Sequence, residues 1–172
     1  MSETEAFDMV CEEIVNRIIE ENVDKDELED LKRKVCGEYG AKKVPTHGEL
    51  LAKASDKQTE KVQDVLQRKP VRTASGVSPV AIMTSPKMCP HGKCLYCPGG
   101  PASEFTDSAQ AYTGDEPASR RAKQNDYDPY GQVKLRLNQL QYIGHPVDKV
   151  DLILMGGTMT SRSHDYQVWF VK

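Results

Sequence analysis

Three closely spaced cysteines limit what this 172-residue chain can fold into. Cys89, Cys94 and Cys97 are separated by four and then two residues, and prolines and glycines lie within and around the run. Because proline and glycine favour an open loop over a helix, we expect the three thiols to lie on one loop. Thiolates at this spacing can bind one soft metal centre, whereas a loop of this kind is a poor place for core cysteines. The spacing therefore predicts a metal site.

The spacing alone leaves the metal open between iron and zinc. Iron–sulfur cubanes usually take four cysteine ligands, so three cysteines would leave one iron able to bind a substrate or cofactor. His91, which lies between the first two cysteines, would instead complete a Cys3His zinc site. The chain would then be a non-catalytic RNA-binding module with a structural zinc knuckle. Tyr96, directly before the last cysteine, is predicted to lie against the cluster or its ligand.

The composition indicates a globular protein of a reducing compartment. Five cysteines, an odd number with three of them clustered, fit metal ligation better than a disulfide framework. No apolar run is long enough to cross a membrane, and the acidic N-terminus has none of the features of a secretory signal. We therefore expect a cytoplasmic protein without a membrane partner.

The charges are distributed unevenly along the chain. Residues 1–30 carry twelve acidic and two basic side chains, whereas residues 31–76 carry eleven basic and five acidic ones. A basic segment of this kind predicts either a polyanion-binding surface or a mixed, solvated face. Three of the cations also have a structural explanation, because they are expected in the last turn of a helix, where the dipole favours positive charge. The eleven candidates are Lys32, Arg33, Lys34, Lys42, Lys43, Lys53, Lys57, Lys61, Arg68, Lys69 and Arg72.

Apolar periodicity predicts a helical domain over residues 1–72. The clearest helix covers residues 5–20, where apolar side chains recur three and four positions apart. A second helix is expected from Asp24, capped by that residue, to a stop at Gly37. Thr46 is predicted to cap a short third helix, and residues 57–69 are predicted to form a fourth.

The remaining residues predict a change to α/β structure. Residues 77–84 read as a buried strand, and the cysteine loop follows its carboxyl end. A helical stretch over residues 117–143 is expected to break at Pro129 and to bury Tyr130, Val133, Leu137 and Leu140. Residues 150–155 read as a second buried strand, which Gly156, Gly157 and Thr158 follow. Strand, helix and strand make a βαβ unit with parallel strands. The cysteine loop and the Gly156, Gly157 and Thr158 stretch are therefore expected at the same edge of the sheet.

Several short motifs lie between about residue 70 and the end of the chain. They are Val71-Arg72-Thr73-Ala74-Ser75-Gly76, the cysteine run from 89 to 101, Tyr112-Thr113-Gly114-Asp115-Glu116-Pro117, Tyr127-Asp128-Pro129-Tyr130, Gly144-His145-Pro146-Val147-Asp148-Lys149 and Met155-Gly156-Gly157-Thr158. These motifs resemble those of the radical S-adenosylmethionine enzymes and, more narrowly, those of the family of the Elongator catalytic subunit, which modifies tRNA. Met159 departs from the phenylalanine usual in the family. The short gap between the first two cysteines is similar to the archaeal or bacterial type.

The resemblance implies a set of cofactors and ligands. Cys89, Cys94 and Cys97 would bind a 4Fe-4S cluster whose fourth iron chelates S-adenosylmethionine, which is cleaved to a 5′-deoxyadenosyl radical. That radical would activate the acetyl group of acetyl-CoA for transfer to carbon five of the wobble uridine of tRNA. S-adenosylmethionine would also contact Tyr96 and the Gly156, Gly157 and Thr158 segment. Lys149 matches a position associated with acetyl-CoA, although an exposed lysine before a strand is an equally good explanation.

The resemblance also implies a domain organisation. Residues 1–72 would form a helical tRNA-binding domain that contacts the anticodon stem-loop, and Tyr39 would be available for stacking. Residues 73–172 would form the first two strands of an incomplete radical S-adenosylmethionine barrel, and the family's C-terminal acetyltransferase domain is absent from the sequence. We therefore expect the chain to be a fragment that is inactive alone. Assembly as a homodimer or with Elongator-like subunits is implied for the whole protein.

Overall fold

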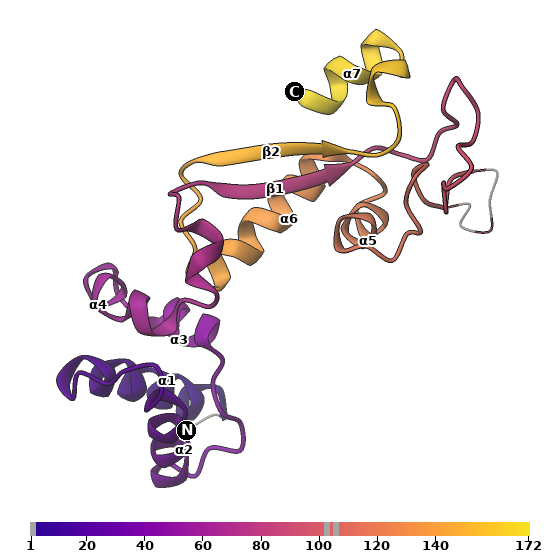
Figure 1. Cartoon of the computed structure of the whole chain (residues 1–172). Coiled ribbons are helices and arrows are strands. Elements are labelled where there is room, and N and C mark those ends of the chain that lie inside the picture. The colour runs from indigo at the N-terminus through magenta and orange to yellow at the C-terminus, as the bar shows by residue number, and fades with distance from the viewer. Residues whose placement is uncertain (1–2, 102–103, 105–106) are drawn as a thin grey trace. The chain divides into compact units, whose positions relative to one another are not determined.

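The computed structural model describes residues 3–101, 104 and 107–172, and these form an α/β structure (Figure 1). It divides into two compact units. The first contains residues 1–78 and 139–148, and the second contains residues 79–138 and 149–172. None of the helices in the described part of the chain has the length and apolarity needed to span a bilayer.

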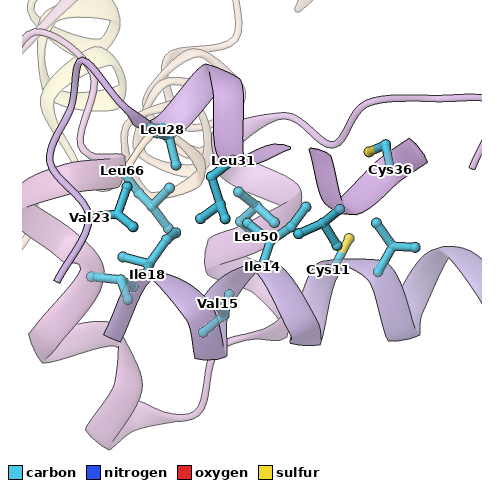
Figure 2. Close-up of a cluster of buried hydrophobic side chains, with 13 residues drawn as sticks. Cys11, Ile14, Val15, Ile18, Val23, Leu28, Leu31, Cys36, Leu50 and Leu66 are labelled. Atoms are coloured by element: carbon cyan, nitrogen blue, oxygen red, sulfur yellow. The ribbon is translucent and has the colours of Figure 1, made fainter. Parts of the chain in front are cut away.

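The first unit is built from four α-helices and a short 3-10 helix. These are α1 (Glu3–Glu20), α2 (Leu28–Glu38), α3 (His47–Lys53), α4 (Asp56–Leu66) and η1 (Pro70–Thr73). The apolar stripe predicted for the first helix is confirmed, because Ile14 and Val15 are buried at 0% and 1% exposure. Figure 2 shows this stripe packed against side chains from the other helices, including Leu28, Leu31, Leu50 and Leu66. The four helices thus share one core.

A capping box fixes where α3 begins, and a second box precedes α2. Thr46 and Glu49 form the predicted capping box at α3, with the Thr46 backbone N–H donating to Glu49 Oε2 at 2.7 Å. The Asp24 side chain accepts the Glu27 N–H at 3.0 Å, and Glu27 accepts the Asp24 N–H at 3.3 Å. The expected box therefore forms, but it encloses a turn, and α2 itself begins at Leu28.

The predicted end of α2 is wrong. The helix continues through Gly37 to Glu38, and Gly40 is the glycine that has a positive φ, of 66°. A β-carbon at Gly37 would have no neighbour within 4 Å, so nothing in its surroundings requires a stop there. Because α2 extends further than expected, its last turn contains no basic residue. The helix dipole therefore does not account for the positions of Lys32, Arg33 and Lys34.

The second unit contains the sheet. Its elements are β1 (Ser78–Met83), α5 (Pro117–Gln124), α6 (Pro129–Tyr142), β2 (Val150–Met155), η2 (Met159–Ser161) and α7 (His164–Val171). β1 and β2 pair side by side and run in the same direction, with α5 and α6 in the connection between them (Figure 1). The helical break predicted at Pro129 is confirmed. The rest of the expected barrel stays a prediction, since the described residues contain two strands.

Two burial predictions for the second unit are wrong. β2 is exposed along most of its length: Ile153 is 42% and Leu154 39% exposed. In the described residues β1 is its only strand neighbour, so one edge of β2 has no partner there. Tyr130 is 71% exposed, although it was expected on the buried face of α6. The buried residue of that turn is Gln132, at 0% exposure.

Candidate functional site

The cysteine loop begins where β1 ends, and one buried amide fixes its first turn. The Cys89 backbone N–H donates to Gln110 Oε1 at 2.6 Å, and Gln110 Nε2 donates to the Gly92 carbonyl at 2.8 Å. The Gly92 N–H in turn donates to the Cys89 carbonyl at 3.0 Å. Gln110 is only 3% exposed, so water competes little for these bonds. The turn that carries the first cysteine is thus held from both sides.

Cys97 is the most buried of the three cysteines, at 8% exposure. Its Sγ accepts a hydrogen bond from the Ala111 backbone N–H at 3.2 Å and lies 3.2 Å from the Gly99 carbonyl oxygen. An N–H group directed at a cysteine sulfur stabilises negative charge on that sulfur, as hydrogen bonds to the sulfurs of metal clusters do. One backbone donor is therefore already directed at this sulfur, as in cysteines that bind a metal cluster.

The other two cysteines lie at more exposed positions. Cys89 Sγ accepts a hydrogen bond from Thr158 Oγ1 at 3.4 Å, and a β-carbon added to Gly157 would lie 3.7 Å from the same sulfur. Cys94 Sγ lies 3.4 Å from His91 Nε2. The structure thus brings the cysteine loop and the Gly-Gly-Thr stretch together at one edge of the sheet.

The glycine stretch after β2 is constrained by its backbone and by its neighbours. Gly156 has a φ of 114°, a conformation that residues with a side chain rarely adopt. A β-carbon there would also clash with Thr84 Oγ1, which donates to the Gly156 carbonyl at 3.1 Å. Gly157 has a φ of 57°. The backbone of this stretch is therefore left bare beside Cys89, where a ligand can approach it closely.

The donor set fits a metal, although the described residues contain no group of three His, Cys, Asp or Glu side chains arranged around a metal position. Three thiols on one loop, one of them bonded by a backbone N–H, supply the sulfur ligands that an iron–sulfur cluster takes. The contact between Cys94 and His91 would also suit the zinc alternative. The identity of the metal therefore stays a prediction.

Tyr96 and Lys149 were expected to bind cofactors, and both project into solvent. Tyr96 is 89% exposed. Lys149 is exposed and precedes β2. A six-residue strand is about 20 Å long, so Lys149 lies at the opposite end of the sheet from the cysteine loop. The roles predicted for these two residues stay predictions.

A cluster of polar residues beside the cysteine loop was not predicted from the sequence. Arg162 Nη2 donates to Ser85 Oγ at 2.6 Å, and its Nη1 donates to the Ser85 carbonyl at 3.2 Å. The Arg162 guanidinium lies 3.8 Å from the centre of the Tyr166 ring, whose hydroxyl accepts the Ser85 N–H at 3.2 Å. These bonds tie the segment before the cysteines to the segment after Thr158. They join residues about eighty positions apart, so no local sequence pattern signals them.

The structure separates ten of the eleven predicted RNA-binding cations into two groups, and the eleventh, Lys42, also has an interaction within the protein. Lys32, which is buried, pairs with Glu29 at 2.9 Å, and Arg33 pairs with Asp30 at 2.8 Å. Two more pairs join Lys43 to Glu49 at 2.5 Å and Lys53 to Asp8 at 2.6 Å. In the described part of the chain no ion pair is made by Lys34, Lys57, Lys61, Arg68, Lys69 or Arg72.

Five of these cations lie within residues 57–72, on α4 and the segment that follows it. The paired cations are largely neutralised by their acidic partners, and the Lys43 ammonium holds the pKa of Glu49 down at about 2. Together with Lys34 on α2, the cations of residues 57–72 therefore carry most of the candidate charge available to an anionic ligand, in a segment that also contains Glu60 and Asp64. We call Lys57, Lys61, Arg68, Lys69 and Arg72 the unpaired cation cluster.

Comparison with known proteins gives consistent results for both units. Residues 7–74 match the family described as the ELP3 N-terminal domain. The chain is 44% identical to a "tRNA uridine(34) acetyltransferase" of Methanocaldococcus infernus, over 92% of this chain and 31% of that protein. It is 37% identical to human "Elongator complex protein 3", over 100% of this chain and 33% of that protein. The corresponding yeast protein is 42% identical, over 84% and 27%. The chain thus spans about a third of the length of these relatives.

Proposed function

On the premise that the chain belongs to the family of Elongator complex protein 3 and the archaeal tRNA uridine(34) acetyltransferases, we propose that it takes part in modifying the wobble uridine of tRNA. The reaction would use acetyl-CoA and place a carboxymethyl-type group on carbon five of the base. Because the match covers about a third of each relative, we propose the complete reaction for the full-length protein and not for these 172 residues alone. Association with a second copy or with Elongator-like subunits is proposed on the same basis.

We propose that the second unit carries a radical centre, in which Cys89, Cys94 and Cys97 bind a 4Fe-4S cluster. The bound cluster would supply one electron for the reductive cleavage of S-adenosylmethionine. The observation that most supports this site is the 3.4 Å contact between Thr158 Oγ1 and Cys89 Sγ. It brings the bare backbone of the glycine stretch beside Cys89, where a small cofactor could touch both.

The residues of this chain would have distinct tasks at that centre. The Ala111 N–H donates to the Cys97 sulfur, and Gln110 holds the turn that presents Cys89. The Gly156 and Gly157 backbone would offer polar groups to S-adenosylmethionine without a side chain in the way. Two further assignments come from the family alone, namely contact of Tyr96 with that cofactor and of Lys149 with acetyl-CoA.

Anaerobic reconstitution with iron and sulfide tests the radical centre. We expect about four irons and four sulfides per chain, and a change in the absorption spectrum when S-adenosylmethionine is added. Cys94→Ala should abolish both. Cys36→Ala is the matched control, because Cys36 is buried in the helical core of the first unit and should not affect iron binding. One zinc per chain without sulfide would refute the radical centre and support the zinc knuckle.

We further propose that the first unit binds tRNA through the unpaired cation cluster. Each cation that neutralises a phosphate releases a counterion, so affinity should fall steeply as salt is raised. Neutralising Arg72 by Arg72→Gln should lower the slope of log affinity against log salt by about one. Arg33→Gln is the matched control, because Arg33 is already paired with Asp30 and should change the slope much less. Equal slopes for the two variants would contradict the assignment.

A further inference from the structure

A hollow opens in the first unit beside the unpaired cation cluster. Its volume is about 420 Å³, which falls in the range of small-ligand pockets. The lining comes from α4, from η1 and the residue that caps it, and from the segment after α6. The lining residues that matter here are Gln63, Gln67, Val71, Thr73, Ala74 and Pro146.

The polar groups of this hollow are held in place by hydrogen bonds. Gln63 Nε2 donates to the Gly144 carbonyl at 3.1 Å. Gln67 Nε2 lies 3.1 Å from His145 Nδ1, and Thr73 Oγ1 lies 2.7 Å from the same nitrogen. Both glutamines are thus anchored through their amide nitrogen, which leaves their carbonyl oxygens as acceptors. Uncharged donors and acceptors at fixed positions are the groups that read the edge of a nucleobase.

The apolar part of the lining is unusually accessible. Val71 is 86% exposed, although it lies between a proline and an arginine in a short helical turn. Lys69, which precedes this turn, has a φ of 55°, a backbone conformation that is costly for a residue with a side chain. Strained backbone of this kind is concentrated at ligand-binding sites. The turn therefore holds an apolar side chain in solvent instead of burying it.

None of the residues that line the hollow is charged, but three of their neighbours in the sequence are cations. Arg68, Lys69 and Arg72 are sequence neighbours of the lining residues and belong to the unpaired cation cluster. No lysine, arginine or carboxylate is among the residues that line the hollow itself. This arrangement suits a ligand with an uncharged, flat part and negative charge on either side of it.

We propose that this hollow binds one unpaired nucleotide of the RNA, with the base inside and the flanking phosphates on Arg68, Lys69 and Arg72. The proposal rests on the proposed function and adds to it a preference for unpaired RNA. A base in a duplex is stacked and paired, so it cannot enter a pocket, whereas a base in a loop can be turned outward. The hollow would therefore distinguish a loop from a stem, which the cations alone cannot do.

A second hollow of the first unit is a weaker candidate. It has a volume of about 760 Å³ and includes Tyr39, which is 47% exposed and has a ring able to stack on a base. Its lining also includes Lys43, whose ammonium lies over the Phe7 ring and is paired with Glu49. The charge at that hollow is thus already balanced within the protein. Tyr39→Ala therefore serves as a comparison for variants of the first hollow in RNA-binding measurements.

The test compares two RNA probes, a hairpin with an unpaired loop and a blunt duplex with the sequence of its stem. Ala74→Leu places an apolar side chain in the hollow, at an exposed position outside any helix interior and without a change in charge. We expect it to weaken hairpin binding about tenfold and to leave duplex binding unchanged. Ala52→Leu, at an exposed position on α3, is the matched control and should change neither affinity.

Two further variants separate the outcomes. Val71→Ser removes the exposed apolar wall and should also reduce hairpin binding selectively, whereas Tyr39→Ala should have no selective effect. If Ala74→Leu binds the hairpin as the native chain does, or loses the same factor for both probes, the pocket proposal is wrong while tRNA binding stands. If the native chain binds neither probe, the proposed tRNA binding fails, and the pocket proposal fails with it.

Discussion

Gln132 provides the sharpest test of how the cysteine loop is supported. Its side chain is 0% exposed and meets the end of β1, the strand from which the loop emerges. Its Oε1 accepts the Met83 N–H at 2.8 Å, and its Nε2 donates to the Met83 carbonyl at 3.1 Å. The Gln132 side-chain amide therefore satisfies the backbone N–H and carbonyl of Met83, as a neighbouring strand would. Gln132→Leu keeps a similar volume but leaves two buried backbone groups without a partner.

The expected loss follows from these two bonds. Leaving a buried donor or acceptor unsatisfied costs about 1–3 kcal/mol, and two such groups would cost about 2–6 kcal/mol. The apolar surface that leucine buries offsets about 1 kcal/mol of this. We therefore expect Gln132→Leu to lower the free energy of unfolding by about 3 kcal/mol. Urea unfolding followed by circular dichroism measures this loss, and hydrogen exchange of the Met83 amide locates it.

Two comparisons make the result decisive. Gln141→Leu, at an exposed position of α6, should change stability by less than about 0.5 kcal/mol. Gln132→Glu retains an acceptor for the Met83 N–H but can donate to the Met83 carbonyl only when it is protonated. Burial raises the pKa of such a carboxyl group, so this variant should be most stable at low pH and lose stability as the pH rises. Equal stabilities for Gln132→Leu and Gln141→Leu would refute the reasoning.

Three other predictions concern thiols, glycines and a carboxylate. Iodoacetamide should modify Cys94 in the native chain and Cys11 only after unfolding, as mapped by mass spectrometry, because burial raises the pKa of Cys11 to about 11. Gly156→Ala should lower stability by about 2 kcal/mol in chemical unfolding, because its φ of 114° is costly for alanine. The pKa of Glu49 in the folded chain is about 2, below its ordinary value of 4.5. The ionised carboxylate therefore stabilises the fold above pH 4.5, and this stabilisation is lost as the pH falls towards 2. Glu49→Gln should remove this part of the acid-unfolding profile.

Each of these predictions has an outcome that contradicts it. Equal modification rates for the two thiols would mean that the helical core is open. Gly37→Ala is the control for Gly156→Ala, because Gly37 lies in a helix with space around it. Gly37→Ala should raise the free energy of unfolding by about 0.5–1 kcal/mol. A change of the same sign in the free energy of unfolding for both variants would be inconsistent with the structure. An unchanged acid profile in Glu49→Gln would show that the carboxylate contributes nothing.

Local sequence patterns predicted those helices and turns that depend on interactions between residues close in the sequence. The stripe of α1, the capping box of Thr46 and the break at Pro129 each depend on residues a few positions apart, and all three are confirmed. The parallel pairing of the two strands followed from their order and the helices between them. The approach of Thr158 to Cys89 is a consequence of that pairing, because both residues follow carboxyl ends of parallel strands.

The errors arose where distant residues decide the outcome. Tyr130 fits the apolar period of α6, yet the buried position belongs to Gln132, because the end of β1 needs a hydrogen-bond partner there. Periodicity cannot show such a need, since a glutamine counts as polar in any pattern. The bonds of Arg162 to Ser85 were missed for the same reason. Support for the loop therefore comes largely from residues that no motif contains.

A count of charges along the sequence does not show which cations are available to a ligand. An excess of basic residues over 31–76 predicted either a polyanion-binding surface or a mixed, solvated face, and the count gave Lys53 and Lys61 equal weight. The structure pairs Lys53 with Asp8 of the acidic helix α1 and leaves Lys61 without an ion pair in the described residues. Part of the negative charge of α1 is thus paired with Lys53, which then offers less charge to an anionic ligand. A chain with a net charge of −3 can therefore be locally positive, as residues 57–72 are, with five basic side chains against the two acidic ones of Glu60 and Asp64.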